Sequence, residues 1–345
     1  MMSTLFFQIG AWNPSTILPI LMVLGADVLR RSQSVPGVAP FSIGWPEFLL
    51  DLLARGRSTL PVESPCTVIN ARSGYARTNR SAVLEHLLRS HNTTPTRGGL
   101  TLTFLYTSQR PGIPGNDIVS YTALAIVFLQ LAAAGVLPIL GIGSDHILTI
   151  TASGTILTTA AGLLLRRQQQ RELCTAREVP ASRRDVVCIT SGNGSAEAIV
   201  VVNEGGGVRI EDLAAGRAGQ LGIAGSLGLG VLVVLWAAVL LALTALESVD
   251  AWCVLALCGA GTTYTAYAAR KWRGGAALGF KFAEERKTVV RADKVMEVLM
   301  KAEELETGVG SALLPVFFPG ALRPEEELWW TERKQALKAT KGLKI

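Results

Sequence analysis

The chain has 345 residues, a formal net charge of +6 and an isoelectric point near 9.2. Hydrophobic residues make up 49% of it and charged residues only 17%, and the mean hydropathy is +0.35. This composition excludes an ordinary soluble domain of the same length. Because the apolar residues are concentrated in blocks, the sequence predicts a polytopic membrane protein with soluble segments.

The first apolar stretch is residues 12–29, and it ends at Arg30-Arg31. A secretory signal would have basic residues before its apolar core and a small-residue cleavage site after it, so a signal peptide is disfavoured. We expect an uncleaved transmembrane anchor with the N-terminus outside. A short helix lying in the membrane interface is the alternative, because Pro14 and Pro19 shorten the regular stretch.

Residues 32–117 are soluble in composition and are predicted to be a cytosolic β-α-β segment. It should begin with a helix over residues 41–53, whose apolar face is expected to lie near the bilayer. That face consists of Phe41, Trp45, Phe48, Leu49 and Leu52. A strand at 66–70, a helix through 83–88 capped by Asn79 or Ser81, and a strand at 100–106 complete this segment.

Four long apolar runs follow, and they predict two transmembrane hairpins, 118–165 and 221–269. The runs are residues 118–140, 147–165, 221–246 and 252–269, and none contains Lys, Arg, Asp or Glu. Each is close to the roughly 20 residues that cross a hydrocarbon core. All 33 Lys and Arg residues lie outside these runs and outside the turns at 141–146 and 247–251. The positive-inside rule therefore predicts about five spans, an external N-terminus and a cytosolic C-terminus.

The two remaining segments, 166–220 and 270–345, are also predicted to be cytosolic. In the first, residues 186–190 and 198–203 flank SGNGS and favour a β-hairpin. In the second we expect a strand at 278–283 and a helix at 293–305. Each cytosolic segment offers only one to three strands, so we do not expect any of them to form a core alone; three separate small appendages are the alternative to one composite domain. The fold class we expect is therefore a membrane α-helical bundle with a composite cytosolic α/β domain of about five strands, built from three discontinuous segments.

A last helix is predicted to begin at Pro324 and to carry Trp329-Trp330. Adjacent tryptophans are common where a membrane meets water, because the ring and its N–H both find partners there. We expect this pair against the inner membrane surface or at the base of the bundle. The competing interpretation is that both rings fill the core of the α/β domain.

A basic turn at residues 73–80 is the main candidate for contact with a lipid headgroup or a phosphate. Its side chains are Arg72, Tyr75, Arg77 and Arg80. They precede a predicted helix, whose N-terminus favours anions. A solvated basic loop is the alternative. The glycine-rich turns at 191–195 and 204–207 lack the P-loop pattern and are interpreted as structural turns.

Asp27 and Gln130 are the strongly polar residues inside the apolar stretches, so they are the candidates for an intramembrane pathway. Asp27 lies three residues before Arg30, near the cytosolic end, where water can reach it. We predict no catalytic residue, because no nucleophile motif is present. The three histidines have no cysteine within four residues, and the five cysteines form no CxxC pair. We therefore expect no metal site, no cofactor and no disulfide framework.

Several phrases of the chain resemble an uncharacterised family of fungal multipass membrane proteins. They are FSIGW at 41–45, SGYARTNRS at 73–81, TASGT at 151–155, SGNGSAEAIVVV with EDLA within 191–214, KVMEVLM at 294–300 and FFPGALRPEE at 317–326. The resemblance extends over most of the chain and keeps the order of its segments. It implies a multipass membrane fold, and the family has no assigned activity to carry over.

Three functions remain open. The leading hypothesis is a non-catalytic membrane protein that binds membrane lipids, or a protein partner through its cytosolic domain; nucleic acid is not an expected partner. The second is a small-solute transporter or channel, whose path would include Asp27 or Gln130. The third is a membrane-bound enzyme acting on lipid, with its headgroup site at residues 73–80.

Overall fold

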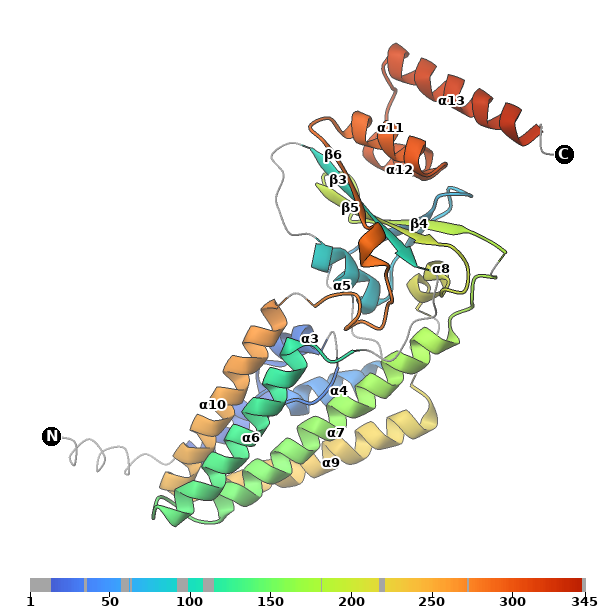
Figure 1. The fold of residues 1–345 in the computed structure, drawn as a ribbon. Helices are drawn as coiled ribbons and strands as arrows, with labels where there is room; N and C mark the ends of the chain where they lie inside the picture. Colours follow the sequence, from blue (N-terminus) through green and yellow to red (C-terminus); the bar gives the residue numbers. More distant parts are fainter. Residues whose placement is uncertain are drawn as a thin grey trace.

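The computed structural model describes residues 14–33, 36–56, 62, 64–91, 99–107, 115–180, 182–216, 221–271 and 273–342. The chain forms a helical bundle with a mixed α/β part at one end of it (Figure 1). These two parts are called the bundle and the sheet part below.

The sheet part contains a six-stranded sheet in the order β2-β1-β4-β5-β3-β6. The strands are β1 (Thr67–Asn70), β2 (Ala76–Thr78), β3 (Leu100–Thr107), β4 (Asp185–Thr190), β5 (Glu197–Asn203) and β6 (Thr288–Ala292). β3 and β5 pair in parallel, and the other pairs are antiparallel. The strands come from all three segments predicted to be cytosolic, so the composite α/β part is confirmed, with six strands where about five were expected.

Alternation along the buried strands gives the sheet two apolar faces. On β5, Ile199 and Val201 face the core that contains α5 (Ala82–His91) and α8 (Ile210–Ala214). Val200 and Val202 face the opposite core. Helices α5 and α8 lie between the sheet and the bundle, and the other face is covered by α11 (Val295–Leu305) and α12 (Val309–Phe317) (Figure 1). Helix α13 (Pro324–Gly342) lies outside α11 and α12 and contacts both through Trp330.

The bundle contains two helical hairpins whose turns lie together at the end away from the sheet (Figure 1). They are α6 (Ile118–Ile139) with α7 (His146–Thr175), and α9 (Ile223–Thr244) with α10 (Ser248–Arg270). Within the described part of the chain, α6, α7 and α9 are long and apolar enough to cross a membrane. Helix α10 has 23 residues but is less apolar, so the five predicted spans are not confirmed.

The N-terminal stretch is not the single continuous helix that was expected. Pro14 onward forms η1 (Pro14–Thr16), α2 (Leu18–Val23) and α3 (Ala26–Ser32), while Trp12 lies outside the described residues. Gly25 separates α2 from α3 with φ +96°, a left-handed conformation that ends a helix. These short helices lie between α9 and α10: α2 packs on α9, and α3 packs on α10.

The predicted apolar helix after this stretch forms as α4 (Trp45–Arg55), but its expected location at the bilayer surface is wrong. All five residues of its apolar face, Phe41, Trp45, Phe48, Leu49 and Leu52, are fully buried in the bundle core. Helix α4 packs on α9, α3 and α2. The apolar face was therefore read correctly, and helices cover it instead of lipid.

Two expectations about the C-terminal segment are corrected. No strand forms at 278–283, where Leu278 and Phe280 instead fill the core beneath the sheet, and the strand comes later as β6, after η3 (Glu284–Arg286). The membrane-surface placement of Trp329-Trp330 is wrong, because α13 lies on the far side of the sheet from the bundle (Figure 1). Trp330 is buried against the sheet core, as the competing interpretation expected.

Candidate functional site

Gln130 lies inside the bundle, where it binds the backbone of an irregular segment, residues 36–44. The Phe41 N–H donates to Gln130 Oε1 at 3.1 Å, and Gln130 Nε2 donates to the Phe41 carbonyl at 2.9 Å. The same nitrogen donates to the Leu257 carbonyl at 2.8 Å. The amide of Gln130 thus satisfies backbone groups that would otherwise be unpaired in an apolar interior.

Three helical glycines give this segment its space. A β-carbon at Gly154 would overlap the Phe41 ring, one at Gly261 would overlap the Phe41 carbonyl oxygen, and one at Gly162 would overlap the carbonyl oxygen of Gly37. Small residues allow backbones to approach closely where helices pack in membranes. The ring of Phe41 also stacks on Trp236, with 6.3 Å between centroids.

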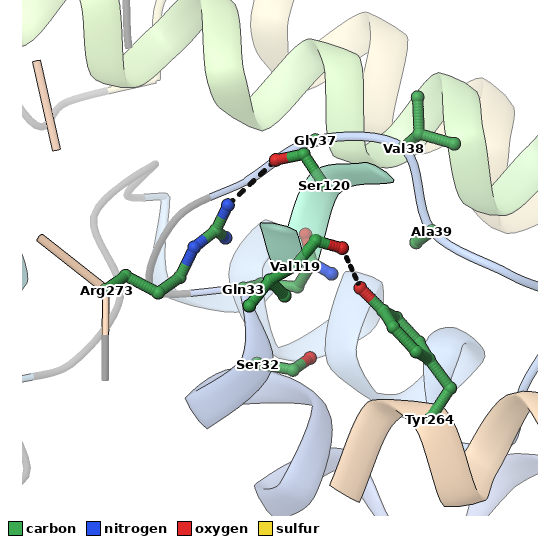
Figure 2. A pocket seen from close by; sticks show the side chains of 9 residues that line it. All are labelled: Ser32, Gln33, Gly37, Val38, Ala39, Val119, Ser120, Tyr264 and Arg273. Carbon is green, nitrogen blue, oxygen red and sulfur yellow. Dashed lines mark hydrogen bonds between the residues drawn. The ribbon is translucent and has the colours of Figure 1, made fainter. Parts of the chain in front are cut away.

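A small recess opens where residues 36–44 leave the bundle near the sheet part (Figure 2). Its lining residues are Ser32, Gln33, Gly37, Val38, Ala39, Val119, Ser120, Tyr264 and Arg273. The cavity volume is about 20 Å³, which accommodates a single water molecule. Gln33 is only 6% exposed, and its Oε1 has no hydrogen-bond partner among the described residues.

Arg273 lines one side of the recess and joins the segment that follows α10 to the start of α6. Its Nε and Nη2 donate to the two carboxylate oxygens of Asp117 at 2.7 Å each. Nη2 also donates to Ser120 Oγ at 2.9 Å, and Figure 2 shows this bond. Asp117 caps the first turn of α6 by accepting from the Ser120 N–H. Burial raises the pKa of the Asp117 carboxyl, but the hydrogen bonds from Arg273 and Ser120 outweigh burial and leave this pKa lowered.

Asp27 is not a buried intramembrane charge. Its side chain is 87% exposed and pairs with Arg30 at 2.7 Å. Arg30 also pairs with Asp51 at 3.1 Å, and Arg55 pairs with Asp51 at 2.8 Å. The structure therefore does not bring the two pathway candidates together: Asp27 pairs with an arginine at the surface, whereas Gln130 bonds to backbone groups in the interior.

The basic turn at 73–80 forms the connection between β1 and β2 and then β2 itself. Arg77 Nη1 donates to the Glu211 carbonyl at 3.1 Å, and its guanidinium lies 5.6 Å from the centre of the Tyr75 ring. Arg72 and Arg80 are exposed. Arg77 thus lies against α8, and Arg77 and Arg80 are not among the residues that line either cavity described here.

Beside α8 lies a second cavity, of about 60 Å³, which we call the arginine pocket. It is lined by Arg177, Glu178, Val179, Pro180, Arg183, Asp185 and Arg209. Glu211 holds Arg209 through Nε at 3.0 Å and Nη2 at 2.7 Å. The same Glu211 supplies the carbonyl that binds Arg77, so α8 fixes two of the neighbouring guanidinium groups.

Asp185 is the buried acid of the arginine pocket, only 8% exposed. Asn70 Nδ2 donates to its Oδ1 at 3.3 Å. Burial raises the pKa of Asp185 and Glu211 adds to that rise, while Arg209 and Arg183 oppose it. Burial therefore disfavours the charged form of Asp185, and the two arginines partly offset this effect.

The glycine-rich turn at 204–207 is structural, as expected. The N–H groups of Gly205 and Gly207 donate to Asn203 Oδ1, and the N–H of Gly206 donates to the Val179 carbonyl. These donors are therefore not available for a phosphate. Among the described residues, no group of His, Cys, Asp and Glu is placed to hold a metal ion.

Sequence reasoning missed Arg273 and the arginine pocket. Arg177 and Arg183 follow the end of α7, and Arg209 follows the glycine turn, so no local motif joins them. Only the pairing of the two backbones brings them together: the Arg209 N–H donates to the Arg177 carbonyl at 2.8 Å.

Comparison with known proteins gave no match to a protein-family model, to a curated protein or to a solved structure. The resemblance to fungal multipass membrane proteins therefore stays a prediction.

Proposed function

We propose that this chain is a non-catalytic multipass membrane protein whose sheet part lies in the cytosol and binds an anionic group in the arginine pocket. In this proposal α6, α7, α9 and α10 cross the membrane, and the hairpin turns face the outside. The distribution of charge supports that orientation, because all 33 Lys and Arg residues lie away from the hairpin turns and the apolar runs.

The convergence of three arginines on one cavity is the observation that carries the binding proposal. Arg177, Arg183 and Arg209 line it from two separate chain segments and outnumber its two acidic residues, Glu178 and Asp185. Guanidinium groups match the geometry of phosphate and carboxylate oxygens. Pockets for whole small molecules have volumes of roughly 300–1,000 Å³, so a cavity of about 60 Å³ fits one charged group of a larger ligand.

The position of the pocket favours a ligand from the aqueous phase over a lipid headgroup. Helix α7 continues from Arg166 to Thr175 before the pocket begins, a rise of about 14 Å at 1.5 Å per residue. The Debye length at physiological ionic strength is only about 8 Å. If Arg166 marks the membrane surface, headgroup charges are largely screened at the pocket.

Binding of pyrophosphate to the full chain in nanodiscs of uncharged phosphatidylcholine tests this proposal by calorimetry. We expect Arg183→Ala and Arg209→Ala each to weaken binding about tenfold, the loss of one charge-assisted contact. Arg291→Ala is the matched control, because Arg291 is exposed on the edge strand β6, away from the pocket. Its affinity should equal that of the unsubstituted chain.

Equal affinity in all four proteins would contradict the arginine pocket as the site. Nanodiscs prepared with about 30% phosphatidylserine test the alternative that the pocket binds a lipid headgroup. Competition of these anionic lipids with pyrophosphate at roughly physiological salt would show that headgroups reach the pocket after all.

A further inference from the structure

The interior of the bundle is polar along one line of side chains. Thr265, Thr158, Thr155, Gln130 and Thr151 are each at most 5% exposed. Counting at 1.5 Å per residue, Thr158 lies about 12 Å along α7 from Arg166, and Thr151 about 22 Å. The recess beside Arg273 is lined by Val119 and Ser120 at the start of α6, so it lies at the sheet-side end of this line. Hydroxyl and amide groups thus extend from that recess past the middle of the helices. Thr155 and Thr265 donate to carbonyls of their own helices, whereas Thr158 and Gln130 donate to residues 36–44.

Residues 36–44 occupy this line as a re-entrant segment. The chain passes Gly162, then Thr158, whose Oγ1 donates to the Ala39 carbonyl at 2.8 Å. It reaches its greatest depth at Phe41, beside Gln130, which lies about 18 Å along α6 from Ile118. It then turns back, and the Ile43 N–H donates to Thr262 Oγ1 at 3.3 Å before α4 begins.

The segment is held by polar contacts that water can replace. Its backbone groups bond to side chains of α6, α7 and α10, and it contains no regular secondary structure between residues 36 and 42. If the segment moved out, it would leave hydroxyl and amide groups around the vacated space, which water hydrates well. Irregular backbone at this depth is tolerated where it is buried in protein or lines a water-filled cavity.

We propose that residues 36–44 are a plug in a polar path through the bundle, and that displacing the plug admits water and small neutral polar solutes. The apolar runs of the helices contain no charged residue, so the path between the recess and Thr151 offers no partner to an ion. At the hairpin turns, the buried Asp250 carboxylate accepts hydrogen bonds from the Ser144 N–H and hydroxyl. Beyond Thr151, Ile147 and Val254 are buried near the hairpin turns, and apolar side chains in such a position are a kind of barrier that opens by wetting. This role is separate from anion binding by the sheet part.

The plug is tested by measuring the glycerol permeability of proteoliposomes that contain the protein. Stopped-flow light scattering records how the vesicle volume changes after an osmotic shock with glycerol. Thr158→Val keeps the side-chain shape and removes the hydroxyl that holds the Ala39 carbonyl. Loss of that bond, worth about 1 kcal/mol, should raise the fraction of molecules with a displaced plug about fivefold. The glycerol permeability that the protein adds to the vesicles should rise by the same factor. Phe41→Ala, which shortens the tip, should raise it further.

Leu235→Ala is the control, because Leu235 is 46% exposed on the outer surface of α9, and it should leave permeability unchanged. The proposal is overturned if Thr158→Val and Phe41→Ala vesicles match the unsubstituted protein, or if Leu235→Ala leaks as much as they do. Thr158→Val alone decides the question where Phe41→Ala yields no folded protein.

Discussion

The sheet part and the bundle are held together by different interactions. In the sheet part, strands such as β5 are buried on both faces, with all seven residues buried, and apolar burial away from water provides the stability. If the bundle lies in a membrane as we propose, the surrounding lipid is as apolar as the helix surface, so close fit and hydrogen bonds provide the stability there. The contacts of Gly162 and Gly261 with the backbone of residues 36–44, and the hydrogen bonds of the Gln130 amide, are examples in the bundle. The same kind of substitution should therefore have different consequences in the two parts.

The largest expected effect is in the sheet part. Val201 is 1% exposed at the centre of β5, so Val201→Asp buries an unpaired charge and should cost about 3–5 kcal/mol. Because the sheet is composite, limited proteolysis should then cleave all three of its chain segments. Val289→Asp, at a 53% exposed position of β6, is the control. If cleavage stays within residues 182–216, the sheet does not unfold as one unit.

A smaller effect is expected at the boundary between the two parts. His86 Nε2 is buried without a hydrogen-bond partner among the described residues. Burial, then the charges of Arg273 and Arg89, lower the pKa of His86 to about 4. The unfolded chain binds the proton near pH 6.5, so stability falls as pH drops from about 6.5 to 4, by up to about 3 kcal/mol.

Thermal unfolding of the chain and of His86→Gln across this pH range measures that contribution. The difference between their stabilities should grow steadily with pH between 4 and about 6.5 and then remain constant. A difference that is independent of pH would show that His86 stays accessible to protons in the folded protein.

In the bundle, the corresponding test is of how closely the helices pack around residues 36–44. Gly154→Ala places a β-carbon against the Phe41 ring and should cost about 1–3 kcal/mol by overpacking. Gly259→Ala is the matched control on α10, since nothing lies within 4 Å of a β-carbon there. Thermal unfolding in detergent should show a lower Tm for Gly154→Ala alone. Equal Tm values would mean that the re-entrant segment is loosely held.

This contrast also explains which elements the sequence predicts. Strands β3, β4 and β5 agree with the predicted bounds to within a residue, because alternation in β3 and β-branched runs around a turn in β4 and β5 determine them. Helix α5 begins one residue before the predicted stretch 83–88 and ends three residues after it. The strand expected at 278–283 failed because short apolar runs do not distinguish a strand from a buried loop. The prediction of one continuous N-terminal helix failed because the positions of the short helices depend on their packing between α9 and α10, which no local sequence pattern encodes.

The candidate sites divide in the same way. Gln130 was identified because a polar residue in an apolar run is conspicuous, but its partner, the Phe41 backbone, is 89 positions away. Arg77 was identified in a basic turn, whereas Arg177, Arg183 and Arg209 are spread through a segment rich in charge. Their convergence depends on backbone pairing across the domain.

No effect at all is expected from glycosidase treatment. The acceptor triplets at Asn79, Asn92 and Asn193 lie in segments that we place in the cytosol. Asn79 is also only 3% exposed, and its side chain bonds to the backbone of Ser81; Asn92 lies outside the described residues. The mobility of the protein from a eukaryotic membrane should be unchanged. A shift abolished by Asn79→Gln would reverse the proposed orientation.

Thiol labelling in sealed right-side-out vesicles tests most directly whether the bundle crosses the membrane with the sheet part inside. Cys174 is exposed on the sheet-side end of α7, and Ile142 is 43% exposed in the turn at the other end. In a chain with Ile142→Cys and the remaining cysteines replaced, a charged, impermeant maleimide should label position 142 from outside. Cys174 should react only after the vesicles are permeabilised. Labelling of Cys174 in intact vesicles, with position 142 protected, would contradict the account.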